Sequence, residues 1–172
     1  ADCNAPEQSQ GRVLRGVCRA MTGALESVPD TRDAFWKNPH TVAELNALRG
    51  DCAIAYLGIE FVDIGETTLQ ARMPVERRTQ QPFGALHGGV SVVMAESMGS
   101  FAGICARPPG SRIAGLEINA NHLRAVTAGW VTGTARALHV GRSTQVWQVD
   151  ITDEAGRLCC VSRMTLAIAA GR

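Results

Sequence analysis

The most informative stretch of this chain reads Gln81-Pro82-Phe83-Gly84-Ala85-Leu86-His87-Gly88-Gly89 and leads into a predicted helix that ends near Cys105. Its proline and first glycine are typical of a loop, and the paired glycines stand where the helix begins. The first N–H groups of a helix have no partner within it and carry the positive end of the helix dipole. This helix start is therefore suited to binding an oxyanion.

The predicted helix, from about Gly88 to Cys105, is made largely of small and apolar residues. Glycine lowers helix stability by about 1 kcal/mol relative to alanine, so an exposed helix would avoid it. We therefore expect another element to pack very close to this helix. Its small residues are Ser91, Ala95, Gly99, Ala102 and Gly103. One acid, Glu96, lies among them, where an unpaired charge would be costly to bury.

Strand-like runs follow the helix, which Pro108-Pro109-Gly110 ends. Glycines punctuate these runs, and Asp153-Glu154-Ala155-Gly156 is a good hairpin turn between the last two. We expect four strands here, Arg112 to Asn121, Gly129 to Leu138, Thr144 to Thr152 and Leu158 to Ala169.

A short helix and a hairpin are predicted before the loop. Thr41-Val42-Ala43-Glu44 has the pattern of a capping box and predicts a helix through Leu48 that Gly50 closes. Two strands, Tyr56 to Ile64 and Thr67 to Met73, are expected to pair through a turn at Gly65-Glu66, and a loop then runs from Pro74 to Leu86.

The order of the elements predicts the fold class. A hairpin, one long helix and four consecutive strands favour an α+β fold in which a six-stranded antiparallel sheet curls around a single central helix. Such an open sheet has a free edge, and a free edge is satisfied when a second copy pairs with it. We therefore expect a homodimer with a continuous sheet.

Length and composition exclude several classes of protein. The 172 residues suggest one domain, and the formal net charge of +1 indicates neither a nucleic-acid partner nor a membrane surface. Six cysteines lack zinc-binding or C-x-x-C spacing, so we expect no metal and mostly buried, reduced thiols in the cytoplasm. Residues 1–35 contain arginines and acids together, which favours an accessory helix or a frayed, partly mobile arm over a targeting segment, with the single domain expected at residues 36–170.

Functional chemistry can be assigned to the loop and helix in two ways. In one, the Gly88 N–H polarises a carbonyl, Glu96 acts on the carbonyl carbon directly or through water, and Gln81 and Ser100 assist. Glu96 and Ser100 share a helical face, but His87 is about half a turn out of phase, so a dyad within one helix is excluded. In the other, Glu96 is a buried structural acid and the glycines only start the helix.

A family resemblance separates these two interpretations. The segment from Gln81 to Gly103 resembles the active-site segment of hotdog-fold acyl-CoA thioesterases, in the group that contains the 4-hydroxybenzoyl-CoA and phenylacetate-pathway enzymes. The resemblance runs in unbroken order from about Trp36 to Ala169. It is closest to the branch of the 1,4-dihydroxy-2-naphthoyl-CoA thioesterases of menaquinone biosynthesis and the enterobactin proofreading thioesterases. The further strings that carry it are Gly115–His122, Leu138–Arg142, Gln145–Gln148 and Asp153–Cys160.

The resemblance implies roles for residues of the loop and helix. Glu96 falls where the family has its catalytic nucleophile or general base, and Gly88 supplies the amide that polarises the thioester carbonyl. Gln81 and His87 occupy positions that orient the thioester, and Ser100 stands where relatives position water. In the family two subunits complete each site, and dimers usually pair into tetramers.

The resemblance also implies a coenzyme A site and an acyl pocket. Phe101 would line the acyl pocket. Arg124 and Arg142 suit phosphate because guanidinium groups bind it bidentately. The residues implied to contact the substrate and CoA are Gly115, His122, Leu123, Arg124, Ala125, His139, Val140, Gly141, Arg142, Ser143 and Thr144.

The expected activity is hydrolysis of an aromatic or other acyl thioester of CoA, or of a carrier protein, without metal or bound organic cofactor. Hotdog domains also serve as non-catalytic acyl-CoA binding modules and as acyl-CoA hydratases or dehydratases. The carboxylate at position 96 argues against the non-catalytic binding module. Release of free thiol would distinguish the three activities.

Overall fold

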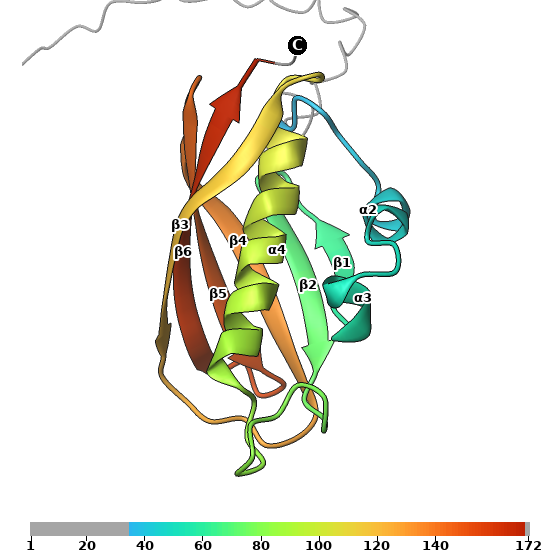
Figure 1. Ribbon diagram of the computed structural model, residues 1–172, viewed down its shortest axis with the longest axis vertical. Helices are drawn as coiled ribbons and strands as arrows, with labels where there is room; N and C mark the ends of the chain where they lie inside the picture. Colours follow the sequence, from blue (N-terminus) through green and yellow to red (C-terminus); the bar gives the residue numbers. More distant parts are fainter. Residues whose placement is uncertain (1–34, 171–172) are drawn as a thin grey trace, which may run out of the picture.

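The computed structural model describes residues 35–170. In it, helix α4 (Gly88–Ala106) lies along the concave face of a curved sheet (Figure 1). The predicted central helix is therefore confirmed to within one residue at its end. The predicted N-terminal arm lies outside the described residues except for Phe35, which packs edge-on against Trp36 at a ring-centroid distance of 4.6 Å.

The sheet has six antiparallel strands in the order β1-β2-β4-β5-β6-β3. This confirms the α+β class and the six strands expected. The strands are β1 (Glu60–Ile64), β2 (Thr68–Pro74), β3 (Arg112–His122), β4 (Trp130–Val140), β5 (Thr144–Asp153) and β6 (Leu158–Ala169).

Small residues let α4 approach the sheet closely, as its sequence predicted. Ser91, Ala95, Gly99, Ala102 and Gly103 are all buried. A Cβ at Gly99 would lie 2.9 Å from the sulfur of Met164, and a Cβ at Gly103 would collide with Leu166 on the same strand. The helix is long and apolar enough to cross a membrane by length and composition alone, but this apolar surface is largely used in packing against the sheet.

Among the described residues, two short helices precede the sheet. Helix α2 (Val42–Leu48) begins with the predicted capping box, in which Thr41 and Glu44 bond to each other's backbone N–H groups. The prediction of a strand from Tyr56 was wrong at its start. Helix α3 (Ala53–Tyr56) occupies this segment, Tyr56 is exposed, and β1 begins only at Glu60, because Gly58 turns the chain with a φ of 71°.

The two edges of the sheet differ in length. Within residues 35–170, β1 is five residues long, whereas β3 is eleven residues long and pairs only with β6. Most side chains of β3 are exposed, and Leu116 is 62% exposed. The free edge that was expected is thus β3, on the side of the molecule next to α4 (Figure 1).

The cysteines of the described part follow the expected pattern. Cys105, Cys159 and Cys160 are buried, Cys52 is exposed, and all four are free thiols. Cys3 and Cys18 lie outside the described residues.

Candidate active site

A hollow of about 380 Å³ opens at the N-terminal end of α4. It brings together two predicted groups that are distant in the sequence, the loop and helix start around Gly88 and the segment that follows β3. Its walls are formed by Gln81, Ala85, Leu86, Gly88, Ser91, His122, Leu123, Arg124, Ala125, Cys159 and Cys160.

The helix start leaves the N–H of Gly88 available to a ligand. His87 is the N-cap: its Nδ1 accepts the N–H of Gly89 at 2.9 Å, and its carbonyl accepts the N–H groups of Val90 and Ser91. The Gly88 N–H donates to no acceptor among the described residues. It therefore stands as a donor at the positive end of the helix, in the wall of the hollow.

Hydrogen bonds hold the loop before α4 in place. Thr79 is fully buried, and its hydroxyl accepts the N–H of Glu76 at 2.9 Å and donates to the carbonyl of Pro74 at 2.8 Å. The N–H of His87 then donates to the carbonyl of Thr79 at 2.9 Å, and the N–H of Leu86 to that of Val126 at 2.7 Å. The loop is thus bonded near its start to the end of β2 and near its end to the segment between β3 and β4.

This loop also sets the orientation of Gln81. The side-chain oxygen of Gln81 accepts the N–H of Phe83, two residues further along a tight turn that Gly84 completes with a φ of 85°. The side-chain nitrogen of Gln81 is then the end of the carboxamide that can donate to a ligand. Gln81 and Gly88 both line the hollow, and each carries a hydrogen-bond donor, the side-chain Nε2 of Gln81 and the backbone N–H of Gly88.

Glu96 lies beyond the hollow, two helical turns from Gly88. Eight residues at 1.5 Å each separate the two positions by about 12 Å along the helix. The side chain of Glu96 is exposed and forms no ion pair with another described residue, so a single chain does not fit the alternative in which Glu96 is a buried structural acid. Its Oε1 lies 3.8 Å from where a Cβ of Gly115 would stand, on the free edge strand.

Ser100 and Phe101 follow Glu96 on α4, and both are partly buried. Ser100 is one turn further along the same face of the helix as Glu96. The Phe101 ring packs against Phe61 of β1 at a centroid distance of 4.6 Å.

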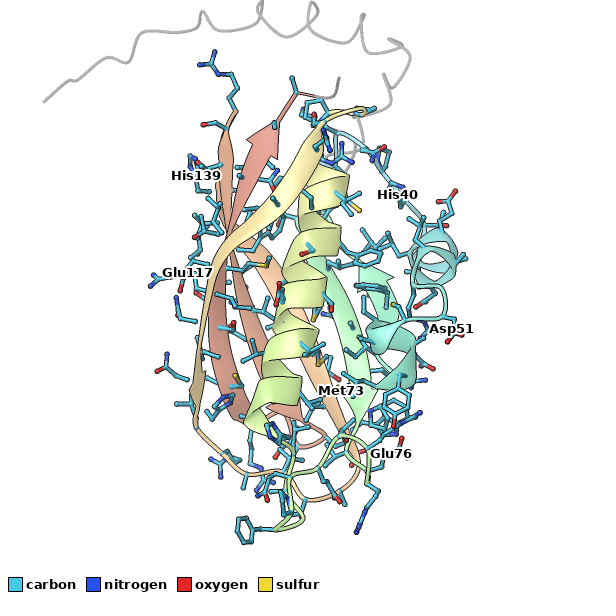
Figure 2. The ribbon with its side chains drawn as sticks, in the orientation of Figure 1. His40, Asp51, Met73, Glu76, Glu117 and His139 are labelled. Atoms are coloured by element: carbon cyan, nitrogen blue, oxygen red, sulfur yellow. The ribbon has the colours of Figure 1, made fainter. Side chains whose placement is uncertain are left out.

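Of the predicted CoA residues, Gly115 lies on β3 beside Glu96, and the others fall into two separate groups. His122, Leu123, Arg124 and Ala125 line the hollow, whereas His139–Thr144 form the turn between β4 and β5 at the opposite end of the sheet (Figure 2 labels His139). Thr144 pairs with Ala167 and His122 pairs with Cys160, so about 23 Å of β6 separate the groups. One chain does not bring them together.

Comparison with known proteins identifies the family of this chain. Residues 83–160 match the Thioesterase superfamily. A 1,4-dihydroxy-2-naphthoyl-CoA hydrolase from Escherichia coli is 52% identical over 134 residues, which are 78% of this chain and 98% of the relative. The chain belongs to the thioesterase superfamily.

This thioesterase has further close relatives. A proofreading thioesterase, EntH, from Cronobacter turicensis is 46% identical over 78% of this chain and 98% of its own length. The crystal structure of a thioesterase from Haemophilus influenzae shares 50% identity and a TM-score of 0.78, over 79% of this chain and 95% of that one. The fold is thus the hotdog fold of acyl-CoA thioesterases, and the protein is a thioester hydrolase.

The structure of this thioesterase adds residues to the hollow that were not predicted for it. Ser91 lies one turn from Gly88 on α4, so helical spacing could have indicated it. Cys159 and Cys160 enter through the pairing of β6 with β3, which no local pattern reveals. Burial raises the pKa of both thiols, so neither has the thiolate character of a nucleophile.

Proposed function

We propose that this thioesterase hydrolyses aromatic acyl-CoA thioesters, 1,4-dihydroxy-2-naphthoyl-CoA or a close relative of it, to the acid and CoA. The observation that carries the proposal is the pair of donors, Gly88 N–H and Gln81 Nε2, on one hollow. Such donors stabilise the oxyanion that forms when a thioester carbonyl is attacked. The Escherichia coli relative, named for hydrolysis of that CoA ester, supports the choice of substrate class.

Glu96 supplies the attacking group in this proposal. Its carboxylate attacks the carbonyl carbon directly to form a mixed anhydride, or removes a proton from water that attacks instead. In both routes the carbon–sulfur bond breaks and CoA leaves as the thiol. A single turnover in ¹⁸O-labelled water distinguishes the routes, because the label first enters Glu96 in one and the product acid in the other.

The site requires two copies of the chain. A carbonyl held by Gly88 lies about 12 Å from Glu96 of the same helix, too far for attack. The long free edge of β3 offers an antiparallel partner for the β3 of a second copy. A two-fold axis that crosses β3 near Ile118 places His122 of one copy opposite Gly115 of the other. Because His122 lines the hollow and Glu96 lies beside Gly115, this pairing brings the hollow of one copy toward Glu96 of the other.

The coenzyme A contacts are divided in the same way. Arg124 in the hollow and Arg142 in the turn between β4 and β5 are both exposed, and neither forms an ion pair within the described residues. Guanidinium groups without a carboxylate partner suit the phosphates of CoA. We assign the turn His139–Thr144 to the CoA bound by another copy, in a dimer or in a tetramer made of two dimers.

Thiol release tests this function directly. The substrates are 1,4-dihydroxy-2-naphthoyl-CoA, benzoyl-CoA, a medium-chain acyl-CoA and an acyl carrier-protein thioester, the last because one relative is named as a proofreading thioesterase. We expect the highest kcat/KM for the aromatic CoA esters. We also propose that the protein acts in the cytoplasm, where free thiols such as its cysteines persist. A preference for the carrier-protein or medium-chain ester would contradict the proposed substrate class.

The Glu96→Gln variant tests the mechanism. It keeps the shape of the side chain but removes the base, so kcat should fall about a hundredfold or more while substrate binding is retained. The matched control is Glu66→Gln, an exposed carboxylate in the turn between β1 and β2, which should leave kcat unchanged. Unchanged turnover in Glu96→Gln would remove Glu96 from the mechanism.

A further inference from the structure

The imidazole of His122 lies directly over the backbone of Gly88. Its Nε2 is 2.8 Å, and its Cδ2 and Cε1 are 3.1 Å, from the point where a Cβ of residue 88 would stand. Glycine is therefore the residue that accommodates this ring at the helix start. His122 is exposed at the end of β3 and, like Gly88 and Gln81, forms part of the wall of the hollow.

The other histidines are placed differently. The Nδ1 of His87 accepts the N–H of Gly89 in the helix cap, and His87 is not among the residues that form the hollow. His40 and His139 lie toward the other end of the molecule (Figure 2). Among the residues around the hollow, Arg124 is the other basic side chain and there is no carboxylate. Histidine, aspartate and glutamate are common proton-transfer residues, and of these types only His122 lines the hollow.

We propose that His122 is the general acid that protonates the departing thiol, an inference that rests on the function proposed above. A carbonyl oxygen bound to the Gly88 N–H places the attached sulfur close to the ring above Gly88. Histidine is the side chain most often used for such proton transfer. The resemblance to the family implied only a contact between this residue and the substrate.

The proton balance closes with the groups named. When the tetrahedral intermediate collapses, the carbon–sulfur bond breaks, its electron pair goes to sulfur, and the Nε2 proton of the imidazolium goes to the same sulfur. The water that supplies the acid product gives up one proton, which returns to His122 through Glu96 or solvent. The net reaction is thioester plus water to acid plus thiol.

Leaving-group dependence tests this role. The substrates are the benzoyl thioesters of N-acetylcysteamine, an alkyl thiol that needs protonation, and of 4-acetamidothiophenol, a more acidic aryl thiol that does not. Both lack the nucleotide of CoA, so the loss of a CoA contact affects them equally. In His122→Gln, kcat/KM should fall about a hundredfold for the alkyl ester and less than about threefold for the aryl ester.

Two control variants show whether the pattern is specific. Arg124→Gln, in the same wall, should change both esters by the same factor. Glu66→Gln, in the exposed turn between β1 and β2, should leave both rates unchanged. Thermal melting of His122→Gln and of a second variant, His122→Asn, confirms that each is folded before its rates are compared.

The outcomes separate this inference from the function on which it rests. An equal fall in kcat/KM for the alkyl and the aryl ester in His122→Gln and His122→Asn would overturn the general-acid role and leave His122 a binding residue. Benzoyl-CoA hydrolysis by the unmodified protein, and its loss in Glu96→Gln, test the proposed function independently of that result.

Discussion

The carboxamide of Gln81 has one orientation because its oxygen is used within the loop. The N–H of Phe83 donates to this oxygen, and the backbone N–H of Gln81 donates to Ala85 at 2.8 Å. A carboxamide whose oxygen is engaged presents its nitrogen as a donor. In the proposed mechanism we therefore expect Gln81 to donate, together with Gly88, to the developing oxyanion.

Gln81→Ala removes one of these two donors. Loss of one oxyanion donor typically lowers kcat by about 10²- to 10³-fold, so we expect kcat for benzoyl-CoA to fall by about a hundredfold with a smaller change in KM. The matched control is Gln80→Ala, because Gln80 donates to the carbonyl of Thr127 at 2.8 Å and is not part of the hollow. Equal kcat values for the two variants would contradict the assignment.

At the scale of residues, the sequence predicts the backbone donor at Gly88 but not which side chains surround it. Paired glycines before an apolar run are a local signal of a helix start, so Gly88 could be found from its neighbours alone. The exposure of Glu96 could not be found, because it depends on the edge position of β3 in the folded sheet. The contact of His122 with Gly88 joins positions 34 residues apart and has no local signature.

At the scale of elements, one carboxylate that accepts three hydrogen bonds holds the turn between β5 and β6. The Asp153 carboxylate accepts the side-chain Nε of Arg157 at 2.8 Å, the Arg157 N–H at 2.9 Å and the Ala155 N–H at 3.0 Å. Hydrogen bonds from the Arg157 side chain and backbone hold the pKa of Asp153 below its usual range. This turn positions the start of β6, where Cys159 and Cys160 enter the hollow.

Acid should weaken this turn selectively. A carboxyl group whose pKa is lower in the folded than in the unfolded state stabilises the fold above the unfolded pKa, and this stabilisation is lost as the pH falls through the folded pKa. The Tm of the unmodified protein should therefore exceed that of Asp153→Asn near pH 7, and the difference should shrink below about pH 4. Thermal melts from pH 7 to pH 3 measure this difference.

The partner of Asp153 provides the control for this measurement. Arg157→Gln removes the side-chain donor, so its Tm deficit should shrink over the same pH range as that of Asp153→Asn. A Tm difference that stays constant from pH 7 to pH 3 in both variants would show that the turn does not couple stability to this carboxylate.

Elements with local signals were predicted well, and those set by tertiary contacts were not. The capping box located α2, and the Asp153 turn located the ends of β5 and β6 to within one residue. Residues 53–56 fold as α3 instead of extending β1, because the backbone turn at Gly58 and packing beside α4 override the strand preference of Tyr56 and its neighbours.

At the scale of the whole molecule, β3 is the exposed edge strand on which we expect a second copy to bind. Leu116 is 62% exposed at the middle of this strand, where an apolar side chain gains from coverage by a second copy. A dimer that pairs β3 with β3 would also complete the active site, so assembly and activity should be lost together.

Leu116→Arg should therefore separate the copies. Light scattering at micromolar concentration should give a dimer or tetramer for the unmodified protein and a monomer for Leu116→Arg, with thiol release falling in parallel. Leu48→Arg, an equally exposed leucine on α2 at 58%, should keep both assembly and activity. A monomeric but fully active unmodified protein would contradict the two-copy site.

The distance of about 12 Å between Gly88 and Glu96 on α4 has a genetic consequence. Gln81→Ala damages the half-site that binds the carbonyl, and Glu96→Gln damages the half-site that attacks it. In a mixed dimer both lesions fall in one active site, and the other site is intact. Two inactive alleles should therefore complement each other, and random mixing of equal amounts should restore about a quarter of full activity, since about half of the dimers are mixed.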